Sequence, residues 1–116
     1  MPKVTIYHNP SCSKSRQTLA LIREQGIEPT IIEYLKTPPT TEELKKVLEL
    51  LDISPSDLLR KKEADIKEAG LDDESLSMDE QIAAMVAYPK VIERPIVISD
   101  GKARIGRPPE SVLDIL

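Results

Sequence analysis

Short runs of apolar and β-branched residues near the start of the chain alternate with polar segments, and their order predicts a β-α-β unit. Residues 4–7 form a strand pattern that ends in a polar loop, and residues 30–34 form a second strand pattern. Between them, helical spacing of apolar residues begins at Ser13 and stops before Gly26, a residue type common just past a helix end. A helix that connects two strands in this way favours parallel pairing of the strands.

The C-terminal part of the chain predicts a hairpin followed by a last helix. The apolar runs 95–98 and 103–105 flank Asp100-Gly101, a dipeptide that strongly favours a tight hairpin turn. Residues 108–109 are both proline and open a helical pattern that continues to the last residue. Together with the N-terminal unit, this order predicts an α/β fold with a mixed sheet.

The middle of the chain, from about residue 40 to 88, predicts an all-helical insertion. Thr40 with Glu43, and Ser77 with Glu80, have the spacing of a helix capping box, in which side chains and backbone N–H groups satisfy each other. Apolar residues recur at helical spacing after each box. Because 116 residues is a usual size for one domain, we expect the whole chain to form a single domain that includes this insertion.

The composition favours a cytoplasmic protein that binds neither nucleic acid nor membrane. The formal net charge is -4, Trp and Phe are absent, and no apolar run is long enough to cross a bilayer. A negative charge opposes unspecific binding to phosphate backbones or anionic lipids, and few aromatic residues leave few platforms for base stacking. The chain runs directly into a strand pattern without an apolar signal region, so we expect a cytoplasmic protein. We also expect it to be a monomer.

The chemistry centres on Cys12, the only cysteine of the chain. A lone cysteine excludes an internal disulfide and a multi-thiolate metal site, and we expect no metal. Cys12 stands between two serines and outside any apolar stripe, which favours a reactive thiol over a buried packing residue. Its predicted place in the first turn of a helix exposes it to unpaired N–H groups and the positive end of the helix dipole. The dipole contributes only about 0.3–1 kcal/mol, so we expect cationic side chains to help ionise the thiol.

Two further polar residues are candidates for this chemistry. His8, the only histidine, either assists the thiolate or is a surface loop residue, and the pattern leaves both interpretations open. Ser15 completes a C-x-x-S spacing, which either places a hydroxyl near the sulfur or is an ordinary serine at a helix start. Because C-x-x-S cannot resolve its own oxidised intermediate as C-x-x-C can, turnover requires an external thiol such as glutathione. A phosphatase-type loop is disfavoured, since Thr18 stands where that loop has arginine.

Three segments, residues 8–16, 92–96 and 106–108, closely resemble the glutaredoxin-coupled arsenate reductases. The likeness spans essentially the whole chain and includes residues 58–61 of the helical insertion. It implies a thioredoxin-like fold with a helical insertion, which agrees with the order of elements predicted from the residue pattern.

The resemblance also assigns roles to particular residues. Arg60, Arg94 and Arg107 match three arginines of the family's oxyanion site. Guanidinium groups suit a doubly charged tetrahedral anion because each donates paired hydrogen bonds and stays charged at any working pH. The resemblance further implies a cis peptide bond before Pro95, which would place this proline across from Cys12.

The reaction implied by the resemblance is the reduction of arsenate to arsenite. Cys12 attacks arsenate, glutathione attacks the thiol adduct, and glutaredoxin reduces the mixed species, so glutathione is a cosubstrate and no cofactor is bound. Two alternatives stay open. One is a glutathione-dependent thiol reductase with another substrate, and the other is a redox-related transcription regulator that binds RNA polymerase. Regulators of that kind use C-x-x-C, in which Ser15 here replaces the second thiol.

Overall fold

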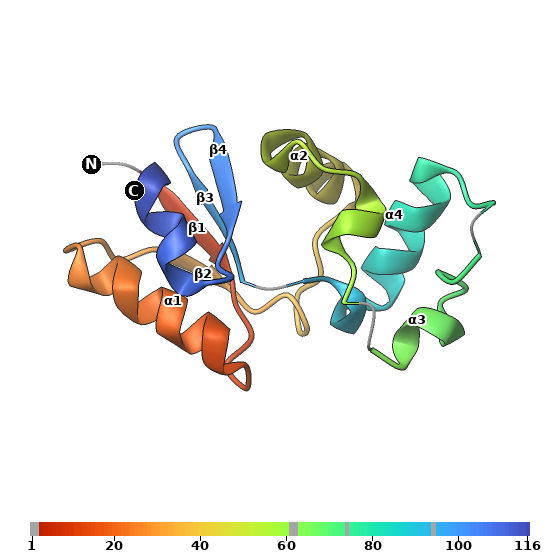
Figure 1. Cartoon of the computed structure of the whole chain (residues 1–116), viewed down its shortest axis with the longest axis horizontal. Coiled ribbons are helices and arrows are strands. Elements are labelled where there is room, and N and C mark those ends of the chain that lie inside the picture. The colour runs from red at the N-terminus through yellow and green to blue at the C-terminus, as the bar shows by residue number, and fades with distance from the viewer. Residues whose placement is uncertain (1–2, 61–62, 74, 94) are drawn as a thin grey trace. The chain divides into compact units, whose positions relative to one another are not determined.

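The computed structural model describes residues 3–60, 63–73, 75–93 and 95–116, and the chain divides into two compact units (Figure 1). The first, here called the sheet unit, contains residues 1–37 and 94–116. The second, the helical unit, contains residues 38–93 and includes the predicted insertion of about 40–88. That the whole chain folds as one domain stays a prediction. No helix within the described ranges is both long and apolar enough to cross a membrane.

The sheet unit contains the predicted mixed sheet, with four strands in the order β2-β1-β3-β4. Strand β1 pairs in parallel with β2 and antiparallel with β3, and β3 pairs antiparallel with β4. The second strand is shorter than predicted, because the backbone turns at Glu33, whose carbonyl accepts hydrogen bonds from the N–H groups of Lys36 and Thr37. The strands are β1 (Val4–Tyr7), β2 (Thr30–Ile32), β3 (Ile96–Ser99) and β4 (Lys102–Ile105).

Two helices cover one face of this sheet, α1 (Ser13–Glu24) and the C-terminal 3-10 helix η3 (Pro109–Ile115). The predicted last helix is thus present, in the tighter 3-10 form. Apolar side chains from both helices meet side chains of the two central strands and form one buried cluster. The cluster contains Val4, Ile6, Leu19, Ile22, Val97, Val112 and Ile115.

The predicted turn residues adopt the backbone conformations that their types favour. Gly26 follows the end of α1 with φ 77°, a left-handed conformation that glycine adopts without steric cost. In the hairpin between β3 and β4, Asp100 and Gly101 have φ values of 46° and 76°. Positive φ at both central positions is the requirement of the hairpin turn that the sequence predicted.

Both of the longer helices in the helical unit begin at the predicted capping boxes. The Thr40 hydroxyl accepts from the Glu43 N–H at 3.1 Å, and the Ser77 hydroxyl accepts from the Glu80 N–H at 3.2 Å. Side chains of the two helices supply much of the unit's buried apolar surface, including Leu44, Val47, Leu48, Ile82 and Met85. The helices are α2 (Thr41–Leu51), η1 (Pro55–Leu58), α3 (Asp65–Glu68), α4 (Met78–Ala87) and η2 (Pro89–Val91).

The helical unit also contains one short piece of extended pairing that the sequence did not predict. Leu59 and Ile92 form an antiparallel bridge. On either side of it, the Arg60 N–H donates to the Val91 carbonyl at 2.7 Å, and the Glu93 N–H donates to the Leu58 carbonyl at 2.7 Å. The expectation of an insertion that is helical throughout is therefore corrected here. The bridge brings the backbone of Arg60 beside that of Val91, and the backbone of Leu58 beside that of Glu93.

Candidate functional site

Cys12 is the N-cap residue of α1, one position before the first helical turn in which the sequence placed it. Its backbone is extended, with φ -95° and ψ 122°. The Cys12 carbonyl accepts the first helical hydrogen bond from the Arg16 N–H at 3.0 Å, and the Cys12 N–H donates to the Asn9 carbonyl at 3.0 Å. The correction leaves the electrostatic argument unchanged, because the N-cap side chain still lies at the positive end of the helix. The side chain is half-buried.

Arg107 reaches the sulfur from the other end of the chain. Its Nη2 donates to Cys12 Sγ at 3.6 Å, a contact between residues 95 positions apart. Arg107 follows strand β4, its N–H donates to the Ile105 carbonyl at 2.9 Å, and its peptide bond to Pro108 is cis. A guanidinium beside the sulfur stabilises the thiolate over the thiol. Two of the predicted site residues are thus brought together.

Gly106 lies in a position where the chain has no room for a side chain. A Cβ built on it would lie 2.5 Å from Thr18 Oγ1 and 2.7 Å from Pro95 Cγ. The Gly106 N–H also donates to the Pro95 carbonyl at 2.9 Å, so this residue packs directly against the buried Pro95. Neither Gly106 nor Thr18 was predicted from the sequence as a support of the site. The glycine preceding Arg107 was the available signal.

His8 and Ser15 form a buried hydrogen-bonded pair beneath the loop that precedes α1. His8 Nδ1 and Ser15 Oγ are 2.6 Å apart, and the Asn9 N–H donates to the same oxygen at 3.0 Å. Because the oxygen accepts from Asn9, we assign its proton to the bond with Nδ1, which puts the proton of a neutral imidazole on Nε2. His8 is 7% exposed and Ser15 is fully buried. In these contacts Ser15 orients the histidine.

The surroundings of His8 favour its neutral form. Burial lowers the pKa of His8 from its ordinary value of 6.5, because the charged ring loses hydration. The carboxylate of Glu33 opposes this effect, while the positive charges of Arg23 and Arg16 add to it. The balance is a lowered pKa, so the ring is uncharged at neutral pH.

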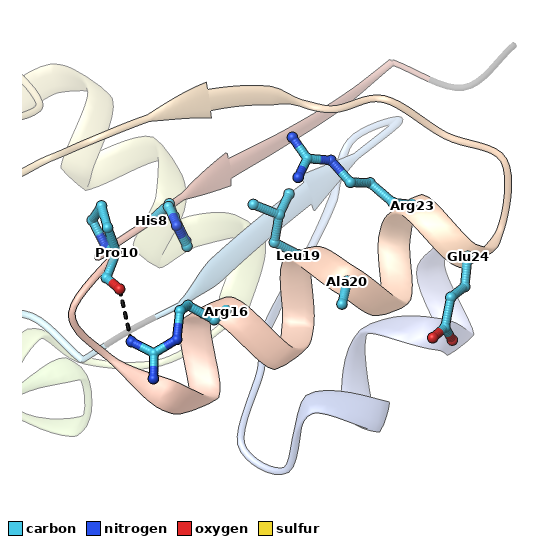
Figure 2. A pocket seen from close by; sticks show the side chains of 7 residues that line it. All are labelled: His8, Pro10, Arg16, Leu19, Ala20, Arg23 and Glu24. Atoms are coloured by element: carbon cyan, nitrogen blue, oxygen red, sulfur yellow. Dashed lines mark hydrogen bonds between the residues drawn. The ribbon is translucent and has the colours of Figure 1, made fainter.

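A groove of about 630 Å³ runs beside α1, in the sheet unit (Figure 2). Figure 2 shows that its lining comes from the loop before α1 and from α1 itself. Arg16 Nη1 donates to the Pro10 carbonyl at 2.8 Å, which holds this arginine against the loop. The sequence analysis did not find the groove, although two arginines seven positions apart on a helix were a visible signal. Residues that line it include His8, Pro10, Arg16, Leu19, Arg23 and Glu24.

Arg60 and Arg94 are the remaining predicted site residues. Arg60 lies in the helical unit, where its Nε is 3.6 Å from Glu93 Oε1 and both side chains are partly exposed. Arg94 lies outside the described residues, and so does the predicted cis bond between Arg94 and Pro95. Across the ranges that the structure describes, no three His, Cys, Asp or Glu side chains gather in a way that could hold a metal ion.

Comparison with known proteins gives a consistent picture. The model of the ArsC family matches residues 7–115. The chain is 47% identical over 116 residues to an arsenate reductase of Escherichia coli K12, and the matched region covers all of this chain and 82% of that protein. It is 53% identical over 115 residues to the E. coli K12 protein YfgD, covering 98% of this chain and 97% of that protein. Among solved structures, an arsenate reductase from Vibrio cholerae has a TM-score of 0.95 and 53% identity, covering 99% of this chain and 98% of that chain.

Proposed function

Because this chain belongs to the ArsC family, we propose that it is an arsenate reductase whose nucleophile is Cys12. One observation supports the choice of nucleophile above all others. Cys12 Sγ lies at the start of α1 with the Arg107 guanidinium 3.6 Å away, so helix and arginine both favour a thiolate. A thiolate nucleophile needs a reducing compartment, and we place the reaction in the cytoplasm.

In the first step, the Cys12 thiolate attacks the arsenic atom of arsenate. A sulfur–arsenic bond forms, and one arsenic–oxygen bond breaks as the oxygen takes up protons and leaves as water. Negative charge on the remaining oxygens increases in the transition state. The Arg107 guanidinium, already beside the sulfur, stabilises that charge through charge-assisted hydrogen bonds. The arsenic is still pentavalent at the end of this step.

In the second step, glutathione supplies the external thiol that a single-cysteine enzyme requires. Its sulfur replaces a further oxygen of the adduct, which leaves as water. The thiol of glutaredoxin then attacks the glutathione sulfur and forms a mixed disulfide between glutaredoxin and glutathione. The electron pair of the broken sulfur–arsenic bond stays on the arsenic, which becomes trivalent. Hydrolysis of the Cys12–arsenic bond releases arsenite and regenerates the thiol, so no bound cofactor takes part.

The remaining candidates have supporting roles in this proposal. Ser15 is a positioning residue, because its contacts hold the His8 ring and the Asn9 backbone beside the start of α1. His8 is neutral, and in the tautomer assigned above its Nε2 carries the ring proton. Oxyanion roles for Arg60 and Arg94 follow from the family resemblance and stay predictions, whose test is the arsenate KM of Arg60→Gln and Arg94→Gln.

A coupled assay tests the proposal directly. Purified protein is mixed with arsenate, glutathione and glutaredoxin, and NADPH oxidation by glutathione reductase is followed. We expect oxidation that depends on arsenate and is lost in Cys12→Ser, which keeps the size of the side chain. Arg107→Gln should lower kcat/KM about 100- to 1,000-fold, the cost of one transition-state donor. Arg104→Gln, which removes an exposed arginine paired with Asp114, is the matched control.

Protection of the thiol separates arsenate from other substrates. If the pocket binds arsenate, millimolar arsenate should slow alkylation of Cys12 by iodoacetamide, whereas sodium chloride at equal ionic strength should not. Absence of both arsenate-dependent turnover and protection would reject the arsenate reductase and leave a thiol reductase with another substrate. Recovery of RNA polymerase subunits by the pure protein, without turnover, would instead favour the transcription regulator.

A further inference from the structure

We infer that the groove beside α1 binds the carboxylates of a small peptide thiol of the glutathione type, and so serves as the cosubstrate site. This inference rests on the proposed function, which requires an external thiol, and it adds the place where that thiol binds. Two of the lining residues flank the nucleophile in the chain, Pro10 two positions before Cys12 and Arg16 four positions after it. Its volume of about 630 Å³ lies within the usual range for small-ligand sites.

The charges of the groove match those of the ligand one by one. Glutathione carries two carboxylates and one ammonium group, and the groove presents two arginines, Arg16 and Arg23, and one carboxylate, Glu24. The arginines are seven positions apart on α1, which corresponds to about 10 Å along the helix axis. An extended tripeptide has a similar length of about 10 Å. Counting Glu28, which pairs with Arg23, two positive and two negative side chains lie at the groove, in a chain whose net charge is -4.

Each arginine keeps donors for a ligand. A guanidinium has five N–H donors. Arg16 uses Nη1 for the Pro10 carbonyl, and this contact fixes the group at the edge of the groove. Arg23 uses Nε and Nη2 for the carboxylate of Glu28, in an exposed pair that contributes little to stability. A ligand carboxylate can therefore bind to Nη1 of Arg23 at small energetic cost.

The His8 ring supplies a third donor of a different kind. It lines the groove and is more than nine-tenths buried, and its one recorded hydrogen bond in the described part of the chain is the one that Nδ1 accepts from the Ser15 hydroxyl. That bond leaves Nε2–H as the ring donor for a ligand. His8 Nε2 is not among the buried unpartnered side-chain atoms of the described residues, and the ring lines the groove, so a ligand acceptor can reach this donor. Leu19 and the ring of Pro10 complete the lining with apolar surface that suits the methylene groups of the peptide.

Binding can be measured without chemistry by using S-methylglutathione, which has no free thiol. The full-length protein is titrated and the ring signals of His8, the only histidine, are followed by NMR. We expect a saturable shift, and a Kd about tenfold higher in Arg23→Gln and in Arg16→Gln, as for the loss of one charge-assisted bond. Glu24→Gln should weaken binding of S-methylglutathione but not of its N-acetylated form. Arg104→Gln, which removes a similarly exposed arginine that is also paired with a carboxylate, should bind as the wild type does.

Kinetics separate this inference from the proposed function. In the coupled assay, Arg23→Gln should raise the KM for glutathione about tenfold and leave the KM for arsenate unchanged. If the wild type is active and its arginine variants keep the normal KM for glutathione, the inference that glutathione binds in the groove is wrong. The proposed arsenate reductase activity is then unaffected. S-methylglutathione binding that depends on Arg16 and Arg23, in a protein without arsenate turnover, would support the groove and reject the reductase. Equal S-methylglutathione binding by all variants would also overturn the groove.

Discussion

Replacement of Gly106 by alanine perturbs the support of the candidate nucleophile through a single methyl group. The added Cβ would lie 2.5 Å from Thr18 Oγ1, 2.7 Å from Pro95 Cγ and 3.1 Å from Thr18 Cγ2, all closer than ordinary van der Waals contact. Neither neighbour can move aside easily. The Thr18 hydroxyl donates to the Lys14 carbonyl at 2.8 Å, and the Pro95 ring is fully buried.

The expected cost of Gly106→Ala is that of overpacking a dense core, about 1–3 kcal/mol. For a domain of this size, 1 kcal/mol lowers Tm by about 4 °C, so Tm should fall by about 4–12 °C. Because Gly106 precedes Arg107, the strain also shifts the guanidinium away from Cys12 Sγ, 3.6 Å away in the native protein. We therefore expect slower alkylation of Cys12 at neutral pH, measured with iodoacetamide, alongside the loss of stability measured by urea unfolding.

Two variants give this experiment its controls. Gly101→Ala places its Cβ in open space but at φ 76°, so it should cost stability through backbone strain and leave the alkylation rate unchanged. Thr18→Ala removes two of the three crowded atoms. It should therefore cost less in the Gly106→Ala background than in the wild type, with a coupling energy of about 1 kcal/mol. A Gly106→Ala protein with native stability and a native alkylation rate would refute the close-packing argument.

Three further predictions concern the histidine, a buried hydroxyl and a helix cap. Because the folded pKa of His8 lies below 6.5, the unfolded chain takes up a proton first, so stability should fall as pH drops from about 7 towards 5. The urea midpoint of His8→Asn should depend less on pH between about 7 and 5 than that of the wild type. An equal change of midpoint with pH in the two proteins would contradict this. Ser99 Oγ is buried without a hydrogen-bond partner in the described structure, so Ser99→Ala should raise the unfolding free energy by about 1 kcal/mol, and a loss of stability would count against this reading. Thr40→Ala removes the cap of α2 and should cost about 1 kcal/mol in chemical denaturation, whereas Thr41→Ala, at the next position, should cost clearly less.

The sequence predicted best those features whose partners lie close together in the chain. The boxes at Thr40 and Ser77 join residues three positions apart, and the Asp100-Gly101 turn depends on the φ values of those two residues alone. The strand at residues 30–34 was predicted too long, because an apolar pattern does not show where a turn at Glu33 takes over the backbone hydrogen bonds.

The candidate site depends on distant contacts, and periodicity does not report these. The contact between Arg107 and Cys12 was anticipated only through family resemblance. The C-x-x-S spacing suggested that the Ser15 hydroxyl lies near the sulfur. The recorded contacts of this hydroxyl are instead with His8 and the Asn9 backbone. The steric need for Gly106 and the groove beside α1 both arise from the packing of side chains in three dimensions, for which a single sequence carries no direct signal.

The strand order of the sheet unit has a consequence for synthesis on the ribosome. Strand β3 lies between β1 and β4, yet it is made about 60 residues after β2, which corresponds to roughly 3–12 s of translation. During that interval β1 has an uncovered edge and Cys12 has no Arg107 beside it. Arg107 is made later still, after β4. The thiol of a nascent chain should therefore react more slowly than that of the finished protein, which delays its reactivity until the sheet can close.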